Sequence, residues 1–240
     1  MILKNLEKHF MKLEQIIYFK NLYKKIYQLV FKFYIFAKLI QIKMSKAEKT
    51  RQFIIEQTAE IFNKKGYAGT SLSDITSATG LTKGSIYGNF ENKDEVAKEV
   101  FLYNSKRLQQ SVSDKMTSEM SSREKLFSIV NFYRTTWETN FLRGGCPMLN
   151  TAIEADDTMP FLKTEVSKSF ENWAQKIINI LEKGKTQNEI VESTDSQKYA
   201  YLFIALIEGG ILLSKTTNNK NHLCNALERI EKIIDSELIK

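Results

Sequence analysis

Residues 71–90 read Ser-Leu-Ser-Asp-Ile-Thr-Ser-Ala-Thr-Gly-Leu-Thr-Lys-Gly-Ser-Ile-Tyr-Gly-Asn-Phe. Ser71 is a natural N-cap for a first short helix, and Asp74 stands three residues later, where a capping box places its acidic partner. Gly80 stands where this helix must end, because glycine readily adopts the left-handed conformation that follows many helices. Thr82 is a natural N-cap for a second short helix. The stretch therefore predicts two short helices joined by a tight turn.

The spacing of apolar and small residues in this stretch agrees with a helix-turn-helix motif. Such a motif has an apolar residue at its fourth position, a small one at its fifth, glycine at its ninth and a branched aliphatic residue at its fifteenth. Counted from Leu72, these are Ile75, Thr76, Gly80 and Ile86. Thr76 is slightly larger than the usual alanine. The alternative is an ordinary αα-hairpin with a glycine turn.

The outward positions of the second helix are small, polar, cationic or aromatic, which is unusual for a helix in a protein core. They suit a helix that lies in a groove of DNA. These positions are Thr82, Lys83, Gly84, Ser85, Tyr87 and Asn89.

The wider sequence around this motif carries a recognisable pattern. Its members are Thr50-Arg51-Gln52-x-Ile54, Phe62, Gly66-Tyr67, Thr70-Ser71, Asp74-Ile75, Gly80, Lys83-Gly84-Ser85-Ile86-Tyr87, Asn89-Phe90 and Lys93-Asp94-Glu95. The pattern, from Thr50 to about Phe101, resembles the N-terminal domain of TetR-family transcriptional repressors. Two positions depart from the common form: Gly88 replaces a bulky residue, and Asn89 replaces a frequent histidine. Both departures concern the DNA sequence that is read and not the fold.

This resemblance implies a repressor whose second motif helix enters the major groove of a palindromic double-stranded operator. Hydroxyl groups near helix N-termini suit phosphate oxygens, and glycine lets the backbone come close to DNA. Phosphate contacts position such a protein, and base contacts set its sequence preference. The expected DNA-binding residues are Thr70, Ser71, Thr82, Lys83, Gly84, Ser85, Tyr87, Asn89 and Lys93.

Positive charge is concentrated at one end of the chain and does not support DNA binding by itself. The net charge of the 240 residues is +7, and residues 1–43 alone, with nine lysines and two glutamates, account for it. These 43 residues are rich in amino acids whose codons use only A and T. We expect them to be upstream sequence translated from an assumed start, with Met44 as the natural one. The alternative is a basic, aromatic helix on a membrane surface or on DNA.

The remaining chain predicts an all-α protein in two parts. Only two prolines and ten glycines interrupt it, which suits long helices. We expect a helix-turn-helix domain at 48–108 and a helical domain for ligand binding and dimerisation at 109–240. Beyond the motif, the expected helices are 93–116, 123–140, 147–157, 160–183, 199–213 and 221–238. The last two have more apolar surface than one subunit needs, and in TetR relatives these two helices form a dimer interface.

Aromatic residues of the middle helices predict an apolar pocket for an unknown small-molecule inducer, although such residues are often plain core. A segment of a TetR subgroup resembles Gly145-Cys146-x-x-x-Asn150, in which the cysteine is sometimes a sensor. Cys146 stands at an expected helix start, where the helix dipole lowers a thiol pKa. The alternatives are therefore a redox-sensing or electrophile-sensing repressor and an inert buried thiol. The expected pocket residues are Phe132, Tyr133, Trp137, Cys146, Asn150, Phe170, Trp173 and Phe203.

Other classes of protein find little support. The chain has two histidines, His9 and His222, and it has no P-loop, metal-ligand cluster or nucleophile–base arrangement. We therefore expect no enzyme activity, no metal and no cofactor. Lysines interrupt the apolar runs of residues 1–43, which argues against a membrane span. Two cysteines, too few for a disulfide framework, indicate a reducing compartment, and we expect a cytoplasmic protein. The inducer, the operator sequence and the regulated genes cannot be read from the sequence.

Overall fold

A computed structural model describes residues 28, 31–32 and 46–240 of the chain. The two expectations for residues 1–43, upstream sequence or a surface helix, lie outside the described residues apart from those three positions. The chain divides into two compact units, Met1–Lys49 and Thr50–Lys240. All elements beyond the first turn of α2 belong to the second unit.

The described part of the chain is helical and has no strand, which confirms the expected all-α class. Its elements are α2 (Lys46–Gly69), α3 (Leu72–Thr79), α4 (Lys83–Tyr87), α5 (Lys93–Ser113), α6 (Ser122–Leu142), α7 (Pro147–Ala155), α8 (Pro160–Thr186), α9 (Ser196–Thr217), α10 (Asn221–Ile233) and a π-helical turn, η1 (Ile234–Leu238). A single antiparallel bridge between Ile190 and Ile239 joins the end of the chain to the loop after α8.

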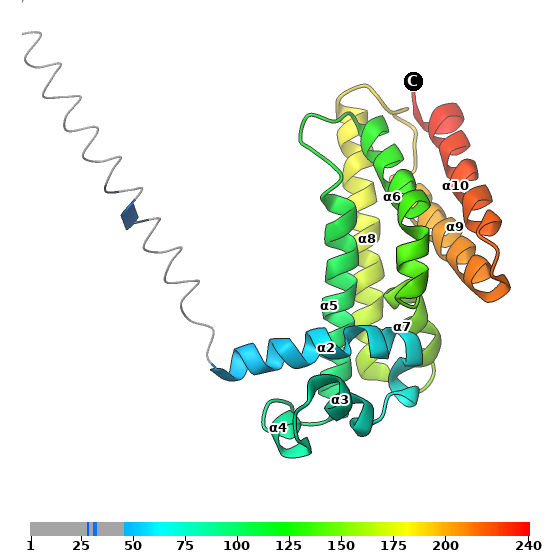
Figure 1. Cartoon of the computed structure of the whole chain (residues 1–240). Coiled ribbons are helices and arrows are strands. Elements are labelled where there is room, and N and C mark those ends of the chain that lie inside the picture. Colours follow the sequence, from blue (N-terminus) through cyan, green and yellow to red (C-terminus); the bar gives the residue numbers. More distant parts are fainter. Residues whose placement is uncertain (1–27, 29–30, 33–45) are drawn as a thin grey trace, which may run out of the picture. The chain divides into compact units, whose positions relative to one another are not determined.

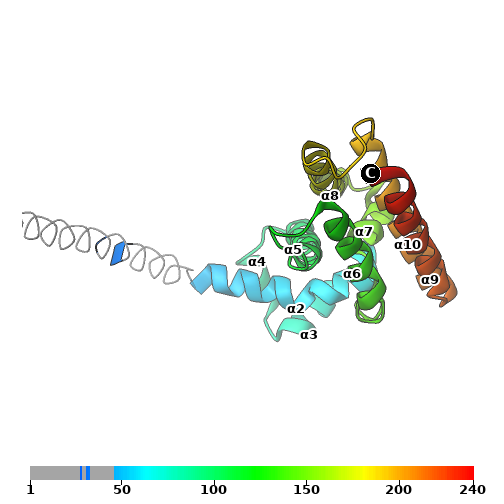
Figure 2. The same ribbon diagram turned by 90° about the horizontal axis from the view of Figure 1, so that it is seen from above.

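The long helices α5, α6 and α8 run side by side, and α9 and α10 pack against them (Figure 1). The short helices α3 and α4 lie at one end of α5, below the bundle. Seen from above, α9 and α10 are on the opposite side of this unit from α4 (Figure 2). The element that continues the motif into the bundle is α5.

Two clusters of buried apolar residues hold this unit together. The smaller is built from α2, α3, α4, Phe90 and the start of α5, and the larger extends from α5 to η1. Val96 and Val100 of α5 belong to the smaller cluster, whereas Phe101 and Val112 of the same helix belong to the larger. The boundary expected between residues 108 and 109 therefore falls inside a helix that both clusters share.

Several helix ends differ from the expectation: α9 extends beyond the expected 199–213 at both ends, and α5 ends at Ser113 instead of residue 116. The sequence also predicts a helix from Thr50 to Lys65 that ends at Gly66. This glycine has φ 73° and kinks the chain, but a helical turn continues to Gly69. The last α-helix ends at Ile233 and continues as the wider π-helical turn η1 instead of running regularly to Leu238. At Gly66 and after Ile233 the helix end contacts a distant element: Glu154 lies beside Gly66, and Ile239 pairs with Ile190. Sequence periodicity does not report such contacts.

Among the described residues, α9 is long and apolar enough to cross a membrane. Its inward residues, which include Phe203, Ile207 and Ile211, are buried in the larger cluster. Core helices of soluble proteins share this composition, so α9 is weak evidence for a membrane span.

Candidate nucleic-acid interface

The first motif helix is capped at both ends by local hydrogen bonds. The Asp74 N–H donates to Ser71 Oγ at 3.1 Å, and the Ser71 N–H donates to Asp74 Oδ2 at 2.8 Å, which completes the capping box. Gly80 ends the helix with φ 67°. Lys65 lies 2.7 Å from the Asp74 carboxylate. Lys65 and then the Ser71 N–H hold the pKa of Asp74 well below its usual range.

One side of the second motif helix, α4, is largely exposed to solvent. Its start is capped by Thr82, whose Oγ1 accepts from the Ser85 N–H at 3.2 Å. Ile86 is fully buried and anchors the helix in the smaller cluster. Tyr87 is 41% exposed, and the ammonium of Lys83 lies 6.0 Å from the centre of its ring. A cation and an exposed aromatic ring therefore share the free face of α4.

Gly84 is not needed by the fold itself. A Cβ atom added there would meet nothing nearer than Thr82 Oγ1 at 3.9 Å, and the residue has ordinary helical geometry. Gly80, by contrast, needs glycine because of its positive φ. The absence of a side chain at Gly84 thus leaves room on the exposed face of α4 for a molecule outside the protein.

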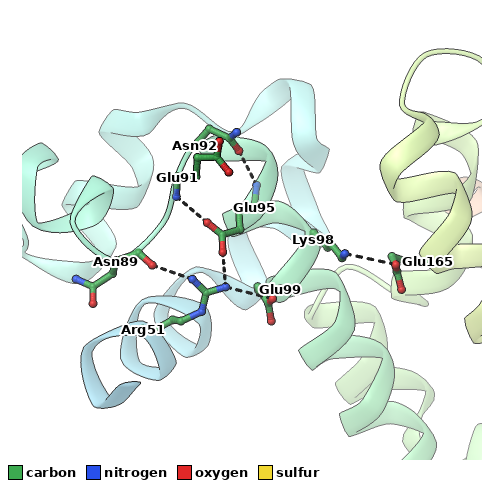
Figure 3. A network of polar contacts seen from close by, with 8 residues as sticks. All are labelled: Arg51, Asn89, Glu91, Asn92, Glu95, Lys98, Glu99 and Glu165. Carbon is green, nitrogen blue, oxygen red and sulfur yellow. Dashed lines mark hydrogen bonds and ion pairs between the residues drawn. The ribbon is translucent and has the colours of Figure 1, made fainter. Parts of the chain in front are cut away.

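Arg51 of α2 holds the end of α4 in place (Figure 3). One guanidinium nitrogen donates to the Asn89 carbonyl at 2.8 Å, and the other donates to Glu95 Oε1 at 2.7 Å. The second nitrogen also lies 3.2 Å from Glu99 Oε1. The guanidinium carbon stands 4.2 Å from the centre of the Phe90 ring. One side chain therefore joins α2, the residues after α4, and α5.

The same network extends along α5 towards α8 (Figure 3). The Glu91 N–H donates to Glu95 Oε2 at 2.6 Å, and Asn92 caps α5 by accepting from the Glu95 N–H at 2.9 Å. The Glu91 N–H and then Arg51 lower the pKa of Glu95. One turn on, Lys98 forms an ion pair of 3.5 Å with Glu165 of α8. Sequence reasoning placed Arg51 in the family pattern but assigned it no role.

The predicted DNA-binding residues fall into two groups. Ser71, Thr82, Lys83, Gly84 and Tyr87 are exposed, and Ser85 is half-buried beside them. The remaining three residues have internal contacts, which are given below.

Thr70 is fully buried, and its hydroxyl donates to the Gly66 carbonyl at 2.6 Å. The Asn89 side chain donates to the Ser85 carbonyl at 2.8 Å. The ammonium of Lys93 lies 4.2 Å from the centre of the Tyr67 ring. The first two side chains are therefore occupied within the protein, and all nine assignments stay predictions.

A carboxylate of α7 binds the backbone at the end of α2. Glu154 Oε2 accepts from the Tyr67 N–H and Oε1 accepts from the Ala68 N–H, each at 2.6 Å. A Cβ atom at Gly66 would lie 2.5 Å from Glu154 Oε2, so both this approach and the positive φ require glycine. Residues 87 positions apart in the sequence are thereby joined just before the motif.

Asn150 strengthens this connection. Its amide donates to the Asn63 carbonyl at 3.0 Å and to the Gly144 carbonyl at 2.7 Å. Lys215 of α9 donates to the same Gly144 carbonyl at 2.6 Å. Burial lowers the pKa of Lys215. The predicted pocket residue Asn150 thus links α2, α7 and α9 through polar contacts.

Two of the eight predicted pocket residues, Tyr133 and Trp173, line an apolar cavity of about 280 Å³. Trp137 and Cys146 border, with Tyr133, a much smaller pocket of about 20 Å³. Phe132 borders an open cleft elsewhere. Phe170 and Phe203 pack against or within the larger cluster and line neither of these pockets nor the cleft.

Cys146 forms a buried pair with Glu208. Its sulfur donates to Glu208 Oε1 at 2.9 Å, and both residues are buried. Burial and then the Glu208 carboxylate raise the pKa of the Cys146 thiol well above its usual range. The N–H groups of Met148 and Leu149 act in the opposite direction and are outweighed. The expected lowering of this pKa by the helix start is therefore wrong, because it ignored burial and the neighbouring acid.

Among the described residues, no group of three histidine, cysteine or acidic side chains could hold a metal ion. The exposed α4 on a three-helix unit, attached through α5 to a helical bundle, defines a helix-turn-helix DNA-binding protein with a second, larger helical core.

Comparison with known proteins specifies the family. A family profile for bacterial regulatory proteins of the TetR family matches residues 54–100, and a tetracyclin repressor-like C-terminal domain profile matches residues 122–230. A TetR-family regulator from Cytophaga hutchinsonii is 42% identical with a TM-score of 0.79, covering 82% of this chain and 99% of that one. A TetR regulator from Chloroflexus aurantiacus is 33% identical with a TM-score of 0.77, at the same coverage. The transcriptional repressor DhaR from a Mycobacterium strain is 29% identical over 72% of this chain and 86% of its own length.

This chain belongs to the TetR family of transcriptional regulators. It is a DNA-binding regulator and not an enzyme, as the resemblance implied.

Proposed function

We propose that this protein is a cytoplasmic, homodimeric repressor that binds a palindromic DNA operator and leaves it when a small-molecule inducer binds. The observation that carries the proposal is the exposed face of α4, with Lys83, Gly84 and Tyr87 free of the core. A helix this short reads few base pairs, so two copies are needed for a specific site.

The surface of α9 supports dimerisation. Leu202, Leu212 and Leu213 are 37%, 41% and 52% exposed, although they are large and apolar. Gly209 lies between them in the sequence, and a Cβ atom there would meet nothing within 4 Å. At the neighbouring Gly210, a Cβ atom would lie 3.0 Å from Leu223 Cα, so this second glycine serves the packing of α10 on α9.

The contribution of α10 to the dimer differs from the sequence-based argument. Its apolar residues Leu223, Leu227 and Ile230 are buried within the protomer. Its outward positions, such as Glu228 and Arg229, are charged. We therefore assign the apolar part of the dimer interface to α9 and a polar rim to α10.

Release from DNA requires that the inducer bind more tightly to one arrangement of the motif and the helical bundle than to another. Two connections can transmit such a preference: the Glu154 and Asn150 contacts from α7 to α2, and the Arg51 and Lys98 contacts along α5. A shift of α7 or α5 by a bound molecule would move α2, and with it the end of α4.

A gel mobility-shift assay on DNA from beside the protein's own gene tests the proposal. We expect a salt-sensitive complex of two protomers on an inverted repeat whose half-sites are one turn, roughly 34–36 Å, apart. Scrambling one half-site should abolish the specific complex. Equal binding to the scrambled and intact sites would contradict the proposal.

A further inference from the structure

An apolar cavity with a volume of about 280 Å³ lies between α5, α6 and α8, with Met148 of α7 at its wall. This volume is at the lower end for small-molecule sites. Its lining is mostly aliphatic and sulfur-containing on the α5 and α6 side. The residues there include Leu108, Val112, Met116 and Ile129.

Two aromatic rings form part of the cavity wall. Tyr133 of α6 and Trp173 of α8 lie 5.9 Å apart between ring centres, at 33° to each other. Both residues are nearly completely buried, with 3% and 4% exposure. An aromatic or aliphatic body of a ligand would find rigid apolar contacts here.

Lys176 is the one charged residue that lines the cavity, and no carboxylate lines it. Lys176 is an exposed residue that borders the cavity from the solvent side. Partial burial of its side chain lowers the pKa of Lys176, and no neighbouring acid opposes this effect. The other lining groups with polar side chains are Gln109, Ser113 and Asn179. The Gln109 amide makes only long hydrogen bonds, 3.4 Å to Ser105 Oγ and 3.3 Å to the Ser169 carbonyl. The cavity therefore offers one cation and spare amide donors.

We propose that this cavity binds an amphipathic organic anion, whose apolar body packs against Tyr133 and Trp173 and whose carboxylate pairs with Lys176. A carboxylate would supply a negative charge beside Lys176, where no acidic side chain lines the cavity, and the apolar body would be removed from water by the apolar wall. As the inducer, such a molecule would contact α5, which carries Glu95 and Glu99, the acidic partners of Arg51. This role rests on the proposed function, whereas binding of the anion does not.

Glu208, a buried acid of the larger cluster's helices, does not favour a cationic ligand in this cavity. It bonds to Cys146 and does not line the 280 Å³ cavity. Its pKa is raised to about 7 by burial, so much of it is protonated at neutral pH. A basic ligand in the cavity would instead lie beside Lys176, which has the same charge.

Three matched probes test the proposal: 4-phenylbutanoate, its neutral amide and the corresponding amine. Binding is measured by fluorescence in a Trp137→Phe background, because Trp173 is then the only tryptophan of the chain. We expect the carboxylate to bind at least tenfold more tightly than the amide or the amine. Lys176→Gln should remove this preference, whereas Lys183→Gln, an exposed lysine of the same helix outside the cavity, should keep it.

A cavity-filling variant, Val112→Phe, should prevent binding of all three probes while the protein stays folded by circular dichroism. Equal affinities for the three probes, an unchanged preference in Lys176→Gln, or no binding of the carboxylate would each overturn the proposal. DNA binding is measured separately by mobility shift. A protein that binds its operator but not the carboxylate would leave the repressor proposal standing, and the reverse result would leave the ligand proposal standing.

Discussion

Glycines of the DNA-binding half have different physical roles. Gly80 adopts a left-handed conformation at the end of α3, and Gly66 combines a positive φ with the close approach of Glu154. Gly84 has neither constraint. An unconstrained glycine in a helix is unfavourable for folding. Its place on the exposed face of α4 therefore indicates a requirement from outside the protomer.

Gly84→Ala is expected to weaken operator binding at least tenfold, which corresponds to about 1.4 kcal/mol. The methyl group would stand between the helix backbone and the DNA. Thermal stability should stay equal or rise by up to about 1 kcal/mol, because alanine favours the helix. Mobility shift and thermal unfolding measure the two effects. Unchanged DNA affinity would contradict the close approach at this residue.

Glu208 makes folding stability depend on pH. Its folded-state pKa is raised to about 7, above the unfolded value of 4.5, because its carboxylate is buried. Its stabilising contribution is therefore complete below pH 4.5 and is lost as pH rises through about 7. Glu208→Gln keeps an acceptor for Cys146 and should remove this loss, so that at pH 8 the variant is more stable than the native protein by up to about 3 kcal/mol.

Urea unfolding at pH 5 and pH 8, at one protein concentration, measures the effect of Glu208→Gln. The difference between native protein and variant isolates this carboxyl from other titrating groups. The same difference at both pH values would show that Glu208 does not titrate between them. One oxygen of this carboxylate has no hydrogen-bond partner in the described structure, which is consistent with its preference for a proton.

At the scale of the elements, the short helix α7 connects the helical bundle to the end of α2. It is only nine residues long, yet it contributes Glu154 to the backbone at the end of α2 and Asn150 to Asn63. Its first residue, Pro147, suits a helix start because proline has no N–H group to leave unpaired. A short helix held at both sides can pass a displacement between the bundle and the motif.

Glu154→Gln is expected to weaken the connection between α7 and α2. An amide has one acceptor oxygen, so it can replace only one of the two bonds to the Tyr67 and Ala68 N–H groups. We expect a loss of stability of about 1–2 kcal/mol, discounted because the carboxylate is only half-buried. Inducer should then release DNA less effectively, although DNA affinity without inducer is retained.

Chemical unfolding measures the stability of Glu154→Gln, and DNA titrations with and without inducer measure the coupling. Glu171→Gln, an exposed acid on α8, is the matched control. A variant with weaker folding but full inducer response would mean that this contact is structural and does not transmit the signal.

A substitution in a second element, α9, tests the proposed dimer interface. Gly209→Leu adds a side chain where the protomer has open space, so the protomer should stay folded. If two α9 helices approach closely in the dimer, the added volume should raise the dimer dissociation constant at least tenfold. Sedimentation velocity over a range of concentrations measures it. An unchanged dissociation constant would move the interface away from Gly209.

At the scale of the whole molecule, charge is balanced in residues 44–240, because the net charge of +7 resides in residues 1–43. Operator binding must therefore depend on local cations near α4 and not on a general positive field. Lys83 on the exposed face of α4 and Lys93 at the start of α5 are the candidates for these cations. The salt dependence of the DNA affinity reports how many phosphates such cations neutralise.

Lys93→Gln is expected to lower the slope of log affinity against log salt by about two if both protomers of a dimer contact DNA. A single bound protomer would lower the slope by about one. Fluorescence anisotropy on labelled operator at several salt concentrations measures this change. Lys183→Gln, far along the chain on α8, should leave the slope unchanged. No change in Lys93→Gln would remove this residue from the phosphate contacts.

Local sequence determined the motif and the fold class. The capping box of Ser71 and Asp74, the left-handed Gly80 and the buried Ile86 depend on interactions within a few residues, which spacing reports directly. The helices of the bundle were predictable for the same reason, since the apolar face of a helix repeats along the chain. Helix ends were less predictable: α9 is longer at both ends than the expected 199–213, and near Gly66 and Ile233 packing against distant elements overrides local preference.

Only the tertiary structure decided which side chains share a site. Of the eight predicted pocket residues, Tyr133 and Trp173 line the main cavity, because helical periodicity shows which residues face inward but not where space remains. The Glu208 carboxylate lies 62 residues from Cys146 in sequence, and burial together with this contact raises the thiol pKa that the helix start was expected to lower. Arg51 and Glu154 gained their roles in the same way, because each binds groups that only the packed helices bring together.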